Sequence, residues 1–317
     1  MRAAVYRRYG DPQVVVITQL ADPSPGPRDV VVRVDAAAVT AADARIRAAR
    51  FPRGFAPMAR LMFGIRAPRR RVLGSAFAGT VVTIGAAVTD WQPGDRVAGM
   101  AGMAMGAHAE LLRVPATKLV AVPDGVELDA AAAVLFGGTT AWHFLHRVVE
   151  VRPRMTVLVN GAAGAVGSST VQLARHLGAT VTAVTSAANE QLVRELGAVA
   201  VIDYRRTPVT SLTGQFDVVV DAVGNLTAAT GKPLLRPTGR LYLAVADLWQ
   251  TISARGQVTA GSSPESTDDM ATLLDLLDRD ILDPIITRTF PLAELPAAHA
   301  LVDSGRKVGN AIVRPQL

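Results

Sequence analysis

The strongest constraint on the fold of this 317-residue chain is a glycine-rich stretch that follows a short apolar run. Residues 156–160 read Thr-Val-Leu-Val-Asn, and residues 161–167 read Gly-Ala-Ala-Gly-Ala-Val-Gly. A helix-forming segment follows at 168–177, and a second β-forming run follows at 180–185. A strand, a tight turn, a helix and another strand make a βαβ unit, which builds a parallel sheet covered by helices. The sequence therefore predicts an α/β fold with a doubly wound parallel sheet. The other expected strands of this sheet are 199–203, 216–223 and 239–245.

The turn also resembles a nucleotide-binding fingerprint. Ala162, Gly164 and Gly167 fall at the three small-residue positions of G-x-G-x-x-G, and Gly161 stands beside the alanine. Glycine at 164 lets a pyrophosphate approach the backbone, and glycine at 167 lets the helix pack closely on the strand. The free N–H groups at the start of the helix attract phosphate. The flanking strands and helix supply the expected context, so we predict a Rossmann-type dinucleotide site. The residues of the turn expected to hold the cofactor are Gly161, Gly164, Ala165, Val166 and Gly167.

The residues after the second strand of this unit favour NADPH over NADH. An NAD site usually has an acid here, bound to the ribose hydroxyls. Thr185 and Ser186 occupy this place, and their hydroxyls can donate to a 2′-phosphate that an acid would repel. Tyr204 and Arg205 follow the third strand and could close over the same phosphate. The alternative is that Thr185 and Ser186 form an ordinary polar strand end.

The first third of the chain has a different pattern. Runs of β-branched residues at 14–17, 29–39 and 79–85 are bounded by Pro, Gly and Asp, which predicts a mainly-β region. The segment 51–71 is rich in Pro, Gly, Met and Arg, and we expect a long surface loop there. A further β-forming run ends the chain at 308–315.

The composition excludes several kinds of site. The chain has no cysteine, so it contains no disulfide, thiolate metal site, iron–sulfur cluster or cysteine nucleophile. His143 and His146 are three residues apart in an expected helix, but no carboxylate is patterned with them as a third ligand. We therefore expect no metal site.

Charge and hydropathy exclude other classes of partner. The net charge is +6, but the arginines are scattered, which argues against a nucleic-acid partner. The densest basic group, Arg66 with 69–71, is either a solvated loop or a docking patch for an anionic ligand. The longest uncharged apolar stretch, 130–145, is shorter than the ~20 residues of a membrane-spanning helix, and the first residues lack the apolar core of a signal peptide. We expect a cytoplasmic protein that does not enter a membrane.

Several motifs, spread over almost the whole chain, together point to one family. They are Ala37-Ala38-Val39-Thr40 with Asp43, the segments 74–82, 92–97 and 138–141, the glycine turn, and the segments 201–204, 216–224 and 308–310. With these motifs the sequence resembles the zinc-free medium-chain dehydrogenases/reductases of the quinone oxidoreductase (zeta-crystallin-like) family. Zinc-binding relatives carry a His-Glu pair where this sequence has Ser75-Ala76.

The resemblance implies two domains. A GroES-like, mainly-β catalytic domain would comprise residues 1–122 and 262–317, and a Rossmann dinucleotide-binding domain would comprise 123–261. The cofactor would lie in the cleft between them. Family members often dimerise by extending the Rossmann sheet, so a homodimer is expected.

The resemblance also assigns further cofactor residues. Those expected beside the nicotinamide half are Thr140, Val223, Gly224 and Ala244. Ser186 and Tyr204 match positions that hold the 2′-phosphate, and Asn189 stands where a lysine is frequent. Asn310 belongs to the last of the shared motifs.

The activity implied is hydride transfer from NADPH, without a metal, to a quinone or an α,β-unsaturated carbonyl compound. The developing oxygen anion needs a hydrogen-bond donor, for which Thr40 is the candidate, and water would supply the proton. An apolar pocket for a small hydrophobic carbonyl or quinone substrate is expected from Phe51, Phe63, Met103, Met105, His108 and Trp249. Each of these side chains could instead pack in the core.

Two other functions stay open at this point. The first is an enoyl-thioester reductase, although no tyrosine stands in the 51–71 segment, where such enzymes carry a candidate proton donor. The second is a weakly catalytic, NADPH-binding protein that binds RNA, for which the scattered arginines give little support.

Overall fold

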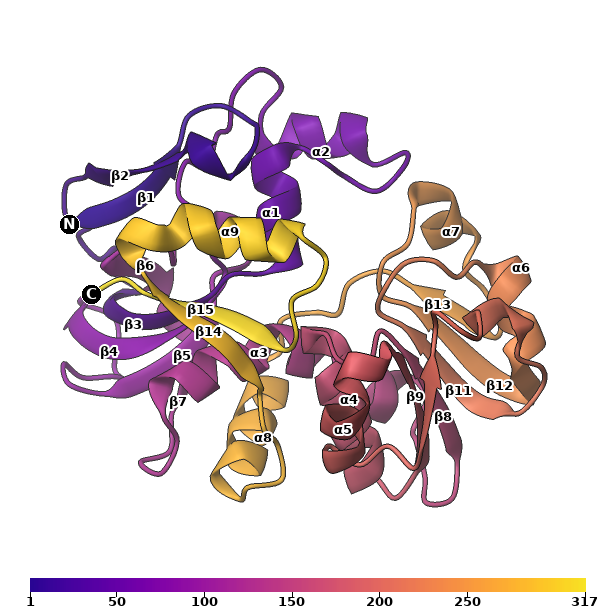
Figure 1. The fold of residues 1–317 in the computed structure, drawn as a ribbon. Coiled ribbons are helices and arrows are strands. Elements are labelled where there is room, and N and C mark those ends of the chain that lie inside the picture. Colours follow the sequence, from indigo (N-terminus) through magenta and orange to yellow (C-terminus); the bar gives the residue numbers. More distant parts are fainter.

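The computed structural model describes residues 1–317 and contains two large sheets, each in its own half of the molecule (Figure 1). The strands of residues 156–260 form one sheet. The other combines strands from the first 121 residues with two strands from the last 32. The domain boundaries at 122/123 and 261/262 stay a proposal.

The first sheet is parallel throughout, in the order β10-β9-β8-β11-β12-β13. Its strands are β8 (Thr156–Asn160), β9 (Thr180–Thr185), β10 (Ala200–Asp203), β11 (Phe216–Asp221), β12 (Leu235–Leu243) and β13 (Val258–Ala260). Val157 and Val159 pack into one apolar cluster and Leu158 into another, on opposite faces of the sheet. Both faces are therefore buried, which explains the nearly pure apolar runs in the sequence.

Helices cover this sheet on both faces. The cluster on one face includes side chains of α3 (Leu128–Trp142), α4 (Ala165–His176) and α5 (Glu190–Glu195). The other face packs against the segment that contains α6 (Ala228–Gly231), and α7 (Leu248–Ser253) lies beside β13. The prediction of a doubly wound Rossmann-type sheet is confirmed.

The second sheet has seven strands, mostly antiparallel, in the order β14-β15-β3-β4-β5-β7, with β6 also paired to β3. Its strands are β3 (Asp29–Ala38), β4 (Ala76–Ile84), β5 (Arg96–Met100), β6 (Leu111–Pro115), β7 (Leu119–Ala121), β14 (Ile286–Pro291) and β15 (Asn310–Arg314). A separate hairpin joins β1 (Arg2–Tyr6) and β2 (Val15–Gln19). The mainly-β character expected for this half is confirmed.

Four helices accompany the second sheet. They are α1 (Ala41–Ala48), α2 (Ala56–Phe63), α8 (Thr267–Asp278) and α9 (Leu295–Asp303). The presence of α2 corrects the expectation that 51–71 is a loop throughout. Its proline, Pro57, lies in the first helical turn, where a proline costs no hydrogen bond. None of the helices combines the length and the hydropathy that a membrane-spanning helix requires.

Two close backbone approaches surround the glycine turn, one within its own half and one from the other half. A Cβ on Gly137 of α3 would lie 2.4 Å from the carbonyl oxygen of Ala165, so only glycine lets α3 pass the start of α4 at this distance. From the other half, Gly309 N donates to the carbonyl oxygen of Ala163 at 2.8 Å. The C-terminal segment therefore lies directly against the turn.

Candidate active site in the cleft between the two sheets

A cavity of about 730 Å³ lies at the carboxyl ends of the parallel strands. Its floor is the turn after β8, and its walls include the ends of β9 and β10 and the loop after β11. The opposite wall comes from the other half, through Thr40 and residues 305–310. Strand order reverses at β8, so the cavity occupies the switch point at which α/β sheets bind ligands.

The glycine turn has the geometry of a phosphate cradle. Gly161 has a φ of 83°, in the left-handed region that favours glycine. A Cβ on Gly167 would lie 2.1 Å from the carbonyl oxygen of Gly161, which only glycine avoids. A Cβ on Gly164 would meet no heavy atom nearer than 3.5 Å, so position 164 faces open space. No side chain caps the N-terminus of α4, and its first N–H groups are left for a ligand.

Five polar residues gather at and just after the ends of β9 and β10. Thr185 and Ser186 are buried at the cavity wall, and Asn189 Nδ2 donates to Thr185 Oγ1 at 3.4 Å and to Ser186 Oγ at 3.3 Å. Tyr204 is half exposed, and the Arg205 guanidinium lies 5.9 Å from the centre of its ring. The structure thus brings together the residues for which the sequence predicts adenosine phosphate binding.

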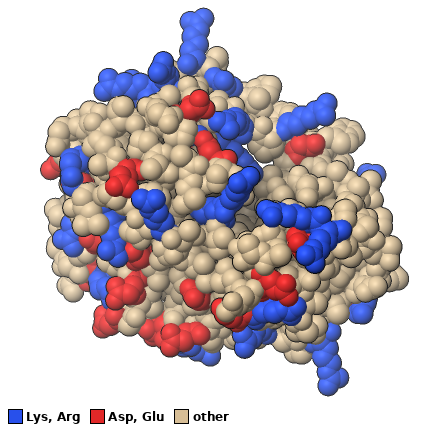
Figure 2. Space-filling model, viewed as in Figure 1, with Lys and Arg blue, Asp and Glu red and all other residues tan.

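The cavity lining carries three cations and no carboxylate. The cations are Arg205, Arg306 and Lys307. Burial lowers the pKa of Lys307 to about 8, and its Nζ donates to the carbonyl oxygen of Gly309. Figure 2 shows basic side chains at the rim of the hollow between the two halves of the molecule. The cavity therefore offers a positive environment to an anionic ligand.

Arg306 and Lys307 were not predicted from the sequence, which pointed to Asn310 instead. Asn310 does line the cavity, but its Nδ2 donates to the carbonyl oxygen of Pro284. The adjacent Arg-Lys pair just before the final β run was the available signal, because that run approaches the glycine turn.

Asp221, at the end of β11, was also missed. It is fully buried, and its Oδ1 accepts hydrogen bonds from Asn160 Nδ2 at 2.9 Å and from Val223 N at 3.0 Å. Its Oδ2 accepts from Leu226 N at 2.9 Å. This carboxylate therefore fixes the loop that separates β11 from α6. The signal available in the sequence was an acidic residue directly after the apolar run 218–220.

Thr40 faces the cavity but its hydroxyl is engaged. Thr40 Oγ1 donates to Asp43 Oδ2 at 2.6 Å and accepts from Asp43 N, which caps α1. The other oxygen of Asp43 accepts from Gly74 N at 2.9 Å. Thr40 must turn away from Asp43, or share its proton, before it can donate to a substrate.

Of the residues expected beside the nicotinamide half, only one lines this cavity. Of the nicotinamide residues, Val223 lines it and Gly224 lines a neighbouring cavity. Thr140 and Ala244 line neither, and Thr140 Oγ1 donates to the carbonyl oxygen of Phe136. Their roles stay predictions.

The six residues expected to form the substrate pocket are not brought together. Phe63, Met105 and His108 are buried in the core of the second half. His108 Nε2 lies 3.2 Å from the carbonyl oxygen of Ala38, and burial lowers its pKa. Met103 is exposed, and so is Trp249 on α7. Only Phe51 lines one of the two cavities, where its ring stacks on Phe63.

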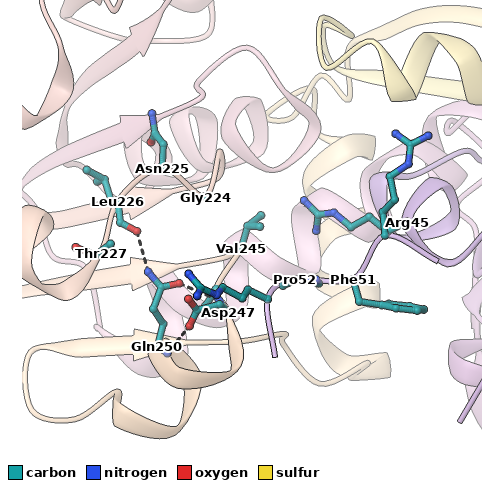
Figure 3. A pocket seen from close by; sticks show the side chains of 13 residues that line it. Arg45, Phe51, Pro52, Gly224, Asn225, Leu226, Thr227, Val245, Asp247 and Gln250 are labelled. Carbon is teal, nitrogen blue, oxygen red and sulfur yellow. Dashed lines mark hydrogen bonds between the residues drawn. The ribbon is translucent and has the colours of Figure 1, made fainter. Parts of the chain in front are cut away.

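That neighbouring cavity measures about 410 Å³. Its walls come from 45–53 on one side and from 224–227 and 245–250 on the other, and it shares Asn225 with the larger cavity (Figure 3). Three of its residues are arginines and one, Asp247, is acidic. It is a continuation of the cleft toward the loop after α1.

The comparisons with known proteins agree with this geometry. Residues 26–124 match the alcohol dehydrogenase GroES-like domain, and residues 196–313 match a family described as zinc-binding dehydrogenase. A quinone oxidoreductase of Pseudomonas aeruginosa is 32% identical over 98% of both chains. A 2-haloacrylate reductase of a Burkholderia species is 30% identical over 99% of both chains. The solved quinone oxidoreductase of Coxiella burnetii, 24% identical over 99% of both chains, has the same fold with a TM-score of 0.88.

The fold and the cleft define a medium-chain dehydrogenase/reductase, an NAD(P)-dependent oxidoreductase. Within that superfamily, this chain belongs to the quinone oxidoreductase family. The resemblance recognised in the sequence is confirmed. The zinc in the matched family's description has no ligand set here, because the chain has no cysteine and no three His, Asp or Glu residues gather as metal ligands would.

Proposed function

We propose that this protein is an NADPH-dependent reductase that transfers a hydride, without a metal, to a quinone or an α,β-unsaturated carbonyl compound. The observation that carries the choice of NADPH is the larger cavity, lined by Arg205, Arg306 and Lys307 and by no carboxylate. The relatives named quinone oxidoreductase and 2-haloacrylate reductase support the choice of acceptor.

The residues of the cavity fit this cofactor. The open position at Gly164 and the uncapped N-terminus of α4 would hold the pyrophosphate. Ser186, Tyr204 and Arg205 would hold the 2′-phosphate, and no acid stands in the lining to repel it. When bound, NADPH supplies the hydride. The loop fixed by Asp221 would position the nicotinamide half through Val223 and Gly224.

Reduction also places negative charge on an oxygen of the substrate. We propose that Thr40 donates a hydrogen bond to this oxygen while sharing its proton with Asp43, and that water delivers the proton of the product. No Asp, Glu or His lines the cavity, and we assign Tyr204 and Lys307 to the phosphates of the cofactor, which leaves water as the proton source.

A titration tests the proposal. Binding of NADPH and NADH is followed by fluorescence, and 1,4-benzoquinone is then added while NADPH oxidation is recorded. We expect NADPH to bind about tenfold more tightly than NADH, a preference that Arg205→Gln reduces. Arg152→Gln is the control, because Arg152 precedes β8 and so lies at the opposite end of the strands.

Each part of the proposal has its own contrary result. Equal affinity for both cofactors would overturn the assignment of the 2′-phosphate site. Binding without oxidation by a quinone or an enone would overturn the acceptor, and a crotonyl thioester would then be tried. Salt-sensitive RNA binding at physiological ionic strength would favour the non-catalytic alternative.

We also propose a cytoplasmic homodimer that pairs through the free edge of the parallel sheet. β13 is the last strand of that sheet, and α7 beside it exposes Trp249 and Ile252, at 76% and 68%. Large apolar side chains next to an unpaired strand edge are typical of an interface. Light scattering should give twice the chain mass, and Trp249→Asp should shift it toward the monomer. A wild-type monomer at micromolar concentration would contradict this.

A further inference from the structure

The smaller cavity has more basic than acidic side chains in its lining. Arg45 lies near the end of α1, and Arg50 and Arg53 lie in the loop that follows. The facing wall carries one acid, Asp247, whose Oδ1 accepts from Gln250 N at 2.7 Å to cap α7. Within the lining, three guanidinium groups therefore face one carboxylate, and that carboxylate already caps its own helix.

The three arginines differ in their partners. Arg50 is exposed and lies 3.3 Å from Asp11 and 3.9 Å from Asp303. Arg53 is exposed and makes no ion pair. Arg45 is partly buried, and no carboxylate lies within 4.0 Å of it. Arg45 is thus the cation of this cavity that is both partly shielded from water and unpaired.

Such a group is costly without an anion. Burial lowers the pKa of Arg45, which reflects the unfavourable transfer of its charge away from water. A planar guanidinium binds a carboxylate or sulfonate through paired hydrogen bonds, and a partly dry site strengthens them. An anion bound to Arg45 would offset the unfavourable free energy of removing its charge from water.

The cavity has room for a small aromatic or alkenyl body, and four of its 13 lining residues are hydrophobic. Figure 3 shows Arg45 on one side and Gly224, Val245 and Leu226 on the other, while the ring of Phe51 points away from them and stacks on Phe63. The volume of about 410 Å³ suits one or two rings, and pockets for small ligands begin at roughly 300 Å³. Gly224 belongs to the loop expected beside the nicotinamide, so an occupant would lie next to the reacting end of the cofactor.

We propose that the natural substrate carries an anionic oxygen group, such as a carboxylate, and that Arg45 selects it. This inference rests on the proposed reductase function and narrows its substrate class from quinones and enones in general to those that carry an acidic group. Arg50 and Arg53, at the rim, add attraction over a longer range that salt screens.

A pair of matched quinones tests the inference. The value of kcat/KM with NADPH is measured for 1,4-naphthoquinone and for 1,4-naphthoquinone-2-sulfonate. Arg45→Gln should lower the ratio of the sulfonate value to the neutral value by about 10- to 100-fold, because one charge-assisted hydrogen-bonded pair is lost. Using a ratio removes the electronic effect of the sulfonate, which is the same in every variant. Arg45→Lys should restore part of the ratio, and Arg152→Gln, with the same change in net charge, should leave it unchanged.

A binding experiment separates this inference from the reductase function. Calorimetry compares 2-naphthoate with 2-naphthamide, neither of which accepts a hydride under these conditions. We expect naphthoate to bind the wild type about tenfold more tightly, and this preference to disappear in Arg45→Gln.

The outcomes are distinct. An unchanged ratio of kcat/KM together with equal binding of the two naphthalene ligands would overturn the role of Arg45 and leave the reductase function standing. Naphthoate binding that depends on Arg45, without reduction of either quinone, would overturn the reductase function and leave the anion site standing. Thermal unfolding of Arg45→Gln checks that the variant is folded.

Discussion

The two cavities of the cleft are built from different parts of the chain. The larger one is made mainly by backbone: a glycine turn, the start of a helix and the ends of three strands. The smaller one is made mainly by side chains that two separate loops bring to face each other. A site made of backbone is fixed by a short stretch of sequence, whereas a site made of facing side chains depends on how the whole chain folds.

The largest effect should come from a methyl group in the backbone-built cavity. Gly167→Ala would place a carbon 2.1 Å from the Gly161 carbonyl oxygen, and neither backbone can retreat. We expect the free energy of unfolding to fall by about 3 kcal/mol, with loss of NADPH binding. Urea denaturation followed by circular dichroism measures the first effect, and fluorescence titration measures the second.

Gly164→Ala is the matched control for this change. Its methyl group would project into the open cavity, so the fold should be kept while NADPH affinity falls about tenfold, through crowding of the phosphate. Destabilisation by the change at 164, with a well-folded Gly167→Ala, would mean that the roles of the two glycines are reversed.

The next effect is a pH dependence of NADPH binding that arises from Lys307 in the larger cavity. The pKa of Lys307 is lowered by burial from 10.5 to about 8, so the side chain is charged at pH 7 and loses its charge as pH rises through 8. A bound phosphate favours the charged form, so the dissociation constant of NADPH should rise by up to about tenfold per pH unit above 8. Lys307→Gln should flatten the profile, and Lys232→Gln, an exposed change elsewhere, should not.

The lowered pKa of Lys307 has the opposite consequence for the ligand-free protein: NADPH binding weakens as the pH rises, but the free energy of unfolding increases. Between pH 8 and 10.5 the unfolded chain keeps the lysine proton that the folded chain has lost. Stability should therefore rise with pH over this window, and the cost of the buried charge is fully present below pH 8. A pH profile of urea midpoints for the wild type and Lys307→Gln would reveal this difference, and identical profiles would contradict it.

The smallest effect is expected at Thr40, where a helix cap and a proposed catalytic donor coincide. Thr40→Val keeps the shape of the side chain but removes its hydroxyl, which should cost about 1 kcal/mol of stability through the lost cap. We expect kcat with a quinone to fall by about fivefold, since the proton is shared with Asp43. Thr40→Ser should restore both properties. Loss of stability with unchanged kcat would limit Thr40 to its structural role.

The sequence predicted the parallel sheet and its phosphate cradle well, for a local reason. The run from Thr156 to Gly167 contains both the strand and the glycines that its turn requires, so neighbouring residues determine the geometry. Nearly pure apolar runs such as Val218–Val220 similarly show that both faces of a strand are buried.

The residues of the substrate pocket could not be predicted from neighbouring residues in the sequence. Phe63 and Met105 are residue types that commonly line apolar pockets, but here they pack in the core of the half that contains the second sheet. Arg45 gives no signal in the sequence, because an arginine at a helix end is ordinarily solvated. Only the fold shows that the loop after β11 faces it and leaves it unpaired.

The pairing of β15 with β3 has a consequence for biosynthesis. Ala37 and Ala38, near the end of β3, meet Val313 and Ile312, which leave the ribosome about 270 residues later. At roughly 5–20 residues per second, this edge of the nascent sheet waits on the order of 15–55 s for its partner strand. The parallel sheet, by contrast, is complete once β13 has emerged. The half of the molecule that starts first is therefore the last to be finished, and its unpaired edge is the place where a chaperone would be needed most.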